Sequence, residues 1–250
     1  MVALVRADVV KIQRRRGVWY STIGIPAGFV LLVGMLGAFF SDLGVAGGGA
    51  FTDDAQFSVG LMTSVIAALL GARLGADEHV GQTFRYQVLS GRPRAQLYLS
   101  KIGALIVLMS IAIVIATLVT IVASYLPESD PDDTVAFRDL LVLFWNLWLP
   151  AVVYGVIALG VGSMMRATGG AIATALVLQF IGLNLLALLT ELWTGFKYVV
   201  VGAALDRLGP DSIDNDDKLR LAIGGAVICL VAWVAIFVVL GLVRTLRSED

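Results

Sequence analysis

The sequence predicts an all-α integral membrane protein with six transmembrane helices, and three observations support this fold class. First, 58% of the 250 residues are hydrophobic and only 15% are charged, which leaves too little polar surface to cover a soluble globule of this size. Second, six windows reach the length of about 20 apolar residues that a helix needs to cross a bilayer. Third, these windows stay apolar throughout, whereas the strands of a membrane β-barrel alternate.

The six predicted spans take up most of the chain, and no remaining segment is long enough to bury a separate soluble core. We therefore expect one transmembrane domain over residues 1–250. The first span follows a basic stretch, but its apolar run is longer than that of a usual signal peptide, so it is expected to stay in the protein. The spans are expected at about residues 18–40, 57–76, 102–126, 140–165, 168–190 and 221–243.

The basic residues predict the orientation of the chain in the membrane. If six spans alternate in direction, most of the 18 basic residues fall on one side, which the positive-inside rule makes cytoplasmic. Both termini are then cytoplasmic, in a multi-pass protein of the plasma membrane. The basic residues on this side are Arg6, Lys11, Arg14, Arg15, Arg16, Arg73, Arg85, Arg92, Arg94, Lys101, Arg166, Arg244 and Arg247.

Two segments outside the spans have patterns of their own. Apolar residues recur at helical spacing within residues 2–12 and predict an amphipathic helix that lies on the cytoplasmic leaflet, although a basic tail that only sets the topology is the alternative. The outer segment 191–217, before the last span, is too long for a tight turn and is apolar at its start. It is expected to be re-entrant or interfacial, with an ordinary amphipathic loop as the alternative.

Small residues recur along the fourth and fifth predicted spans and predict close approach of helix backbones, within the subunit or between subunits. They are Gly155, Gly160, Gly162, Gly169, Gly170 and Ala173.

The chain lacks the motifs of common membrane enzymes. It contains no GxxxxGK[ST] phosphate-binding loop, no HExxH motif and no GxSxG motif, and its one histidine is His79. The single cysteine, Cys229, excludes an intramolecular disulfide and any cysteine-based metal site. We therefore expect no catalytic residues, no metal site and no bound cofactor in this chain.

Ionisable residues are almost absent from the centres of the spans, which disfavours an ion-coupled transporter. Three polar residues within spans, Asn146, Gln179 and Asn184, are candidates for lining a translocation path. The alternative is that they form hydrogen bonds between helices.

The charged loop at residues 77–101, between the second and third spans, predicts a helix, a turn and a second helix. Val80, Phe84 and Val88 form a narrow apolar stripe, Gly91 suits the position after a helix, and Pro93 suits the first turn of a helix that continues through Lys101 into the third span. Such a rigid pair of helices can transmit force, whereas a solvated loop that only enforces topology is the alternative.

The same loop resembles a known pattern. Glu78, Thr83, Leu89, Gly91, Arg94 and Lys101, spaced as ExxxxTxxxxxLxGxxRxxxxxxK, resemble the motif between spans two and three in the permease subunits of type-2 ABC exporters. The order of elements along the whole chain is similar to that family as well. One departure is that Gln82 stands where the family pattern has glycine, with Gly81 before it.

The resemblance implies a permease that exports cargo with energy from a separate ATPase, which would bind the ATP and Mg²⁺. It also implies a second copy of the permease or a sister subunit as a partner in the lipid bilayer, and no nucleic-acid partner. The coupling loop would dock on the ATPase through Glu78, His79, Gly81, Thr83, Phe84 and Arg85, together with Arg94. The cargo class (drug, peptide, lipid or glycan) stays open.

One alternative function comes from a different class. The acidic outer loops would also suit a membrane sensory or immunity protein that binds an antimicrobial compound or a partner protein without moving it. Ligand binding without stimulation of an ATPase would favour this alternative.

Overall fold

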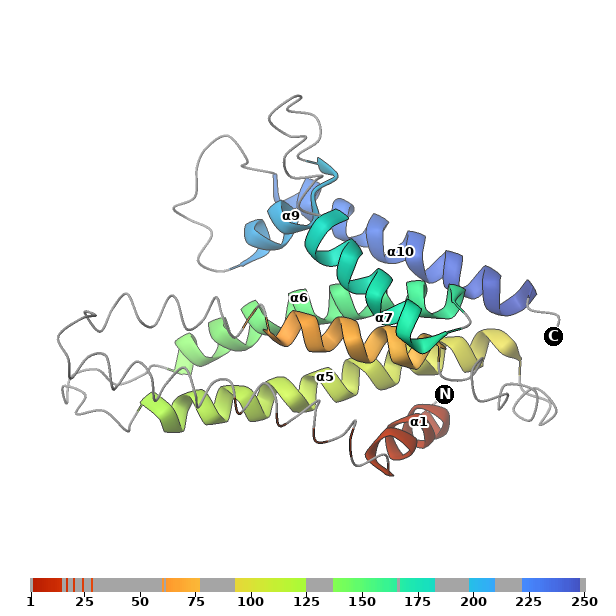
Figure 1. The fold of residues 1–250 in the computed structure, drawn as a ribbon. Coiled ribbons are helices and arrows are strands. Elements are labelled where there is room, and N and C mark those ends of the chain that lie inside the picture. Colours follow the sequence, from red (N-terminus) through yellow and green to blue (C-terminus); the bar gives the residue numbers. More distant parts are fainter. Residues whose placement is uncertain are drawn as a thin grey trace.

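The computed structural model describes twelve stretches or single positions of the chain, and their regular structure is helical (Figure 1). This agrees with the predicted all-α class. The described residues are 2–14, 17, 20, 24, 28, 60, 62–76, 93–124, 137–165, 167–182, 198–209 and 222–247.

Three helices of the described part are long and apolar enough to cross a membrane: α5 (Arg94–Ser124), α6 (Phe137–Met164) and α10 (Ile223–Arg247). They coincide with the predicted spans at 102–126, 140–165 and 221–243. Two shorter apolar helices, Met62–Ala76 and Thr168–Gly182, fall within the predicted spans 57–76 and 168–190. The predicted span at 18–40 lies outside the described residues except for Tyr20, Gly24 and Gly28.

Helix α5 begins directly after Pro93, which lacks a backbone N–H. The Pro93 carbonyl oxygen accepts hydrogen bonds from the backbone N–H groups of Gln96 (2.9 Å) and Leu97 (3.4 Å), as expected at a helix start. From Arg94 the helix continues to Ser124. A helix thus runs through Lys101 into the third predicted span as expected, with Pro93 directly before its first residue.

Helix α1 (Val2–Arg14) lies where the N-terminal helix is predicted, and it packs across the start of α5 (Figure 1). Ile12 of its apolar stripe is buried in the main hydrophobic core. Val5 lies so close to Gly103 that a Cβ atom at position 103 would be 2.8 Å from its Cγ2 atom. A polar contact reinforces this packing, because Ser100 Oγ donates a hydrogen bond to Asp8 Oδ2 at 2.7 Å.

The contact between Asp8 and Ser100 gives a testable prediction. Replacing Ser100 by alanine leaves the Asp8 carboxylate without this donor, and a hydrogen bond to a charged group contributes about 1.5–3 kcal/mol. We expect S100A to lower the free energy of unfolding by about this amount and to expose residues 2–14 to protease. Ser110→Ala is a matched control, because Ser110 lies on the same helix and bonds to Trp148 and Ile106 instead of α1. Equal protease sensitivity of the two variants would contradict the prediction.

The Met62–Ala76 helix contacts α6 backbone to backbone. A Cβ atom at Gly71 would overlap the Gly155 carbonyl oxygen, and one at Gly162 would overlap the Ala72 carbonyl oxygen. Gly75 faces the Leu159 carbonyl oxygen in the same way, at 2.5 Å from the Cβ position. The two helices can approach this closely only because these positions have no side chain.

On its other side, α6 contacts α10. A Cβ atom at Gly160 would lie 2.5 Å from the Phe237 carbonyl oxygen. The predicted close approach is therefore confirmed for Gly155, Gly160 and Gly162. For three other small residues it stays a prediction, because Gly169 has no described atom within 4 Å of a Cβ position, Gly170 has ordinary contacts only and Ala173 is exposed, which leaves contacts between subunits. Their helix, α7 (Thr168–Val177), buries Ala171 and Ala175 on a different face.

Helix α7 continues into a π-helical turn, η1 (Leu178–Gly182). Buried alanines form the contact between α7, α6 and the Met62–Ala76 helix. They are Ala171 and Ala175 of α7, Ala158 of α6, and Ala68, Ala72 and Ala76 of the Met62–Ala76 helix.

A short helix, α9 (Val201–Leu208), lies within the predicted outer segment 191–217. It packs on α6 and α10 through a buried apolar cluster that includes Val201 and Leu205. Two tryptophan side chains fasten this segment: Trp145 Nε1 donates to the Leu208 carbonyl oxygen at 3.2 Å, and Trp233 Nε1 donates to the Val199 carbonyl oxygen at 2.8 Å.

Aliphatic side chains cover the outward faces of α5 and α10. This surface matches the hydrocarbon core of a bilayer and agrees with a membrane location. The exposed side chains include Val107, Ile111, Val114 and Leu118 of α5 and Ile228, Val231, Ile236 and Val239 of α10.

Candidate functional site

The structure describes three of the residues that the sequence singled out. Arg94 is the first residue of α5, Asn146 lies in the first half of α6, and Gln179 lies in η1. The others lie outside the described residues: Glu78, His79, Gly81, Thr83, Phe84, Arg85 and Asn184.

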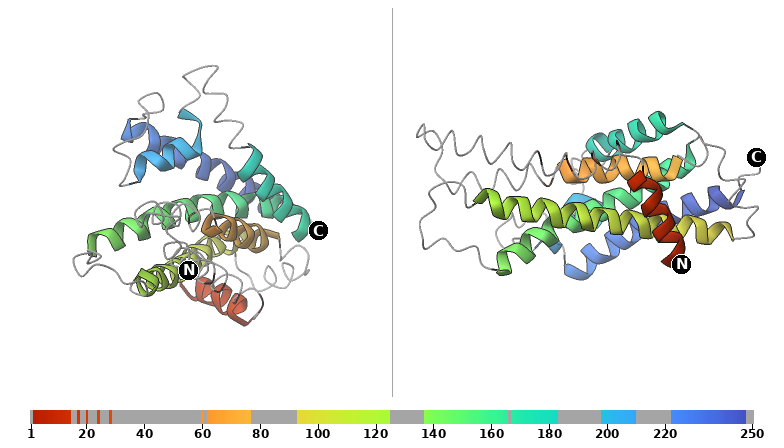
Figure 2. Two further views of the ribbon diagram at one scale, coloured as in Figure 1. Left: turned by 60° about the vertical axis from the view of Figure 1, so that its left-hand side comes forward. Right: turned by 90° about the horizontal axis from the view of Figure 1, so that it is seen from below.

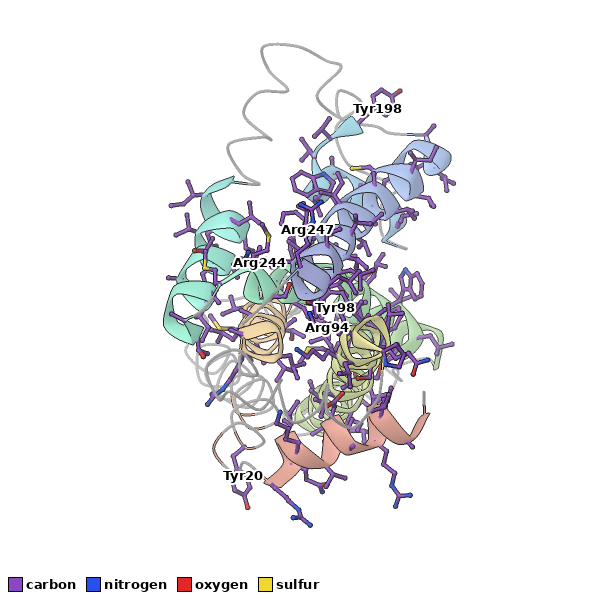
Figure 3. The ribbon with its side chains drawn as sticks, turned by 90° about the vertical axis from the view of Figure 1, so that its right-hand side faces the viewer. Tyr20, Arg94, Tyr98, Tyr198, Arg244 and Arg247 are labelled. Carbon is purple, nitrogen blue, oxygen red and sulfur yellow. The ribbon has the colours of Figure 1, made fainter. Side chains whose placement is uncertain are left out.

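Arg94 ties the start of α5 to the end of α10. Its Nη1 atom donates a hydrogen bond to the Leu246 carbonyl oxygen at 3.3 Å. The last turn of α10 leaves carbonyl groups without helical partners and carries partial negative charge, so a guanidinium group is favourable there. Figure 3 shows Arg94 close to the end of α10 that carries Arg244 and Arg247.

Tyr98, one turn further along α5, is fully buried between the ends of α6 and α10. A Cβ atom at Gly241 of α10 would overlap the Tyr98 hydroxyl group and would lie 2.6 Å from Ser163 Oγ of α6. Thr245 closes the same turn of α10 by donating its hydroxyl to the Gly241 carbonyl oxygen at 2.8 Å. The start of α5 and the ends of α6 and α10 thus form one tightly packed junction, which we call the three-helix junction.

Basic residues gather at the end of the bundle that holds the three-helix junction. Figure 1 and the right-hand view of Figure 2 place α1, the start of α5 and the last turns of α10 at this same end. Lys101 is 4% exposed although it carries a charge, and it follows Ser100, which binds Asp8 of α1. The described basic residues here include Lys11, Arg14, Arg94, Lys101, Arg244 and Arg247.

Gln179 contacts the Met62–Ala76 helix. Its Nε2 atom donates a hydrogen bond to Ser64 Oγ at 2.9 Å, and Ser64 is buried. The amide therefore pairs with Ser64 and not with Asn146. Near Asn146, α6 is joined to α5 through Trp148, whose Nε1 atom donates to Ser110 Oγ at 2.9 Å.

Sequence reasoning missed Tyr98, Ser163 and Ser64. An isolated tyrosine or serine in an apolar span has no pattern that separates it from other packed residues. Ser64 does have one signal, because it continues a spacing of four residues with Ala68, Ala72 and Ala76.

Metal chemistry has no support in the part of the chain that the structure describes. Within residues 2–14, 62–76, 93–124, 137–182 and 198–247, leaving aside their gaps, no three His, Cys, Asp or Glu side chains are placed to hold a metal ion.

Comparison with known protein families identifies a match. A family model described as "ABC-2 family transporter protein" matches residues 4–183, well over half of the chain. This range contains the loop 77–101, the three-helix junction residues of α5 and α6, and the contact between Gln179 and Ser64. No curated protein matches the chain.

Proposed function

Because the chain belongs to the ABC-2 family of transporter proteins, we propose that it is the permease subunit of an ATP-driven exporter. The match over residues 4–183 is the observation that carries this function. It identifies a membrane permease of an ABC-type transporter, and such permeases are typically non-catalytic subunits that associate with an ABC ATPase. ATP and Mg²⁺ bind to the ATPase in this proposal, and this chain carries no cofactor.

The loop 77–101 couples the two subunits. Its docking residues are Glu78, His79, Gly81, Thr83, Phe84 and Arg85, and Arg94 supports it from the start of α5. The geometry of α5 supports this role, because the loop leads into a helix that runs from Arg94 to Ser124. A displacement of the loop would move the whole span, since a helix transmits force along its axis.

The three-helix junction extends this coupling to two more helices. Arg94 and Tyr98 hold the start of α5 against α10 and α6, so all three ends would move together. Helix α1, which is fastened to Ser100 by Asp8, would follow α5.

The chain crosses the plasma membrane six times with both termini in the cytoplasm. The basic residues at the end of the bundle with the three-helix junction support this orientation. Residues 2–14 then lie along the cytoplasmic leaflet, and α9 lies on the outer side. Two permeases, either identical or sister subunits, enclose the translocation path, which Asn146, Gln179 and Asn184 help to line.

Copurification tests the proposed function. The intact chain, purified from its native membrane by an affinity tag, is expected to retain an ATP-binding-cassette ATPase. Proteoliposomes with the pair are expected to export cargo with ATP but not with a non-hydrolysable ATP analogue. If no ATPase is retained, or if export proceeds with the analogue, the proposed function is wrong.

A further inference from the structure

The apolar face of α1 is covered by the rest of the protein. Ile12 is 7% exposed within the main hydrophobic core, and Val9 packs against the same core. Val5 lies against Gly103 of α5. An amphipathic helix at a membrane ordinarily buries its apolar face in the boundary between headgroups and acyl chains. In α1 this face is occupied by protein, so the opposite face is the one that meets the surroundings.

The opposite face of α1 is exposed and basic. Arg6, Val10 and Arg14 are spaced by four residues, so they lie on one side of the helix, and all three are exposed. The one acidic residue of α1, Asp8, is turned to α5, where it accepts the hydrogen bond from Ser100. We call the surface formed by Arg6, Val10 and Arg14 the basic face of α1. It carries positive charge that no carboxylate of the same helix balances.

The contacts of α1 with α5 place the basic face at the level of the membrane surface. The exposed apolar side chains of α5 begin at Leu99 and continue with Val107 and Ile111. Helix α1 touches α5 at Ser100 and Gly103, within this range. Because an α-helix rises about 1.5 Å per residue, Gly103 is only about 6 Å from Val107 along the axis. The right-hand view of Figure 2 shows α1 running across the bundle at this level, at the edge of the lipid-facing surface.

We propose that the basic face of α1 binds the phosphate groups of acidic lipids in the cytoplasmic leaflet. The planar guanidinium group of arginine matches the oxygen atoms of a phosphate and donates two hydrogen bonds to it. Arg6 and Arg14 lie eight residues apart, about 12 Å along the axis, which suits a surface with many headgroups. Val10 contacts the nearest part of the acyl chains. Only the assignment of this side as cytoplasmic rests on the proposed function.

The acidic surface of a protein such as the ATPase is the other candidate partner for this charge. The depth of α1 favours lipid. Helix α5 begins at Arg94, next to the coupling residues, and Ser100 lies six residues, or about 9 Å, further toward the bilayer. A soluble partner that docks on the coupling loop meets the chain beyond Arg94, whereas lipid headgroups surround the level at which α1 lies.

Hydrogen exchange of the backbone amides of residues 2–14 tests the proposal. The purified full-length chain is placed in nanodiscs of phosphatidylcholine, with or without phosphatidylglycerol that has the same acyl chains. Lipid that holds α1 slows this exchange, because the helix must open before its amides meet water. Each arginine near an acidic membrane surface contributes about a fivefold factor, so phosphatidylglycerol is expected to slow the exchange by up to about 25-fold. High salt is expected to remove most of this difference, because it screens exposed charges.

Two double variants with the same loss of charge locate the effect. Arg6→Gln with Arg14→Gln keeps residues that favour a helix but removes both charges, so residues 2–14 are expected to exchange at the same rate in both lipids. Arg244→Gln with Arg247→Gln is the matched control, because it removes two exposed charges of α10 from the same end of the bundle (Figure 3). This control is expected to keep the full response of residues 2–14 to phosphatidylglycerol.

Four results would overturn the proposal. Two of them are equal exchange of residues 2–14 in both lipids, and an unchanged response in R6Q/R14Q. Equal protection by soluble glycerol phosphate in phosphatidylcholine nanodiscs would assign the basic face to a free phosphate. Protection that appears only when an ATPase subunit is added would assign it to a protein. Because the lipid comparison contains no ATPase, its failure is distinguishable from a failure of the copurification test.

Discussion

Gly162→Ala is expected to destabilise the protein strongly, although it adds only one methyl group. The added Cβ atom would overlap the Ala72 carbonyl oxygen, and the neighbouring backbone of the Met62–Ala76 helix cannot rotate away as a side chain can. Overpacking of a core costs about 1–3 kcal/mol, and a clash with backbone belongs at the upper end of this range. Thermal unfolding of the detergent-solubilised chain would measure the loss.

Gly224→Ala is the matched control for this prediction. Gly224 is also a helical glycine, but no described atom lies within 4 Å of a Cβ at this position. Alanine there should leave the stability unchanged or raise it by up to about 1 kcal/mol, since alanine loses less backbone entropy in a helix. If G162A and G224A unfold at the same temperature, the contact between α6 and the Met62–Ala76 helix is not as close as the structure indicates.

Reversal of charge at the coupling loop is expected to have the largest effect on function. Arg94→Glu removes the hydrogen bond to Leu246 and places a carboxylate beside the negative end of α10. The two effects are each worth about 1 kcal/mol, so they should reduce coupled transport about tenfold or more. Proteoliposomes would show this loss as a lower rate of ATP-driven export. The amount of ATPase that stays bound to the permease would be measured on the same samples.

Two further variants separate the roles of the coupling residues. Glu78→Lys is expected to reduce ATPase retention without changing the unfolding temperature of the isolated chain, whereas R94E should lower both, because Arg94 also holds α10. Arg207→Glu is the control, since Arg207 is a basic residue of α9, away from the coupling loop. Export by R94E at the level of R207E would refute the proposed role of Arg94.

The sequence predicted those parts of the fold that depend on long, uniform patterns. Long apolar runs located α5, α6 and α10, and Pro93 located the start of α5, because proline lacks an N–H and suits the first turn of a helix. Spacing also predicted the N-terminal helix. It did not predict that this helix binds α5 through Asp8 and Ser100, because a contact between residues 92 positions apart leaves no local pattern.

Other features depend on which face of a helix meets a neighbour. Gly160 and Gly169 look equivalent in the sequence, yet one contacts α10 and the other has no described atom within 4 Å of a Cβ position. The π turn at residues 178–182 is too short to change the apolar periodicity of its span. For the candidate site, the sequence identified Gln179 as a polar residue in a span, but its pairing with Ser64 follows only from how the two helices pack.

The glycines on two sides of α6 also have a consequence for the synthesis of the protein. The chain is made from its N-terminus, so the Met62–Ala76 helix is available when α6 enters the bilayer, but α10 is made last. Until then the backbone around Gly160, which α10 later covers, has no side chain of its own to shield it. A nascent or truncated chain that ends before residue 223 therefore exposes this surface, and it is the form that insertion factors would hold and membrane proteases would degrade.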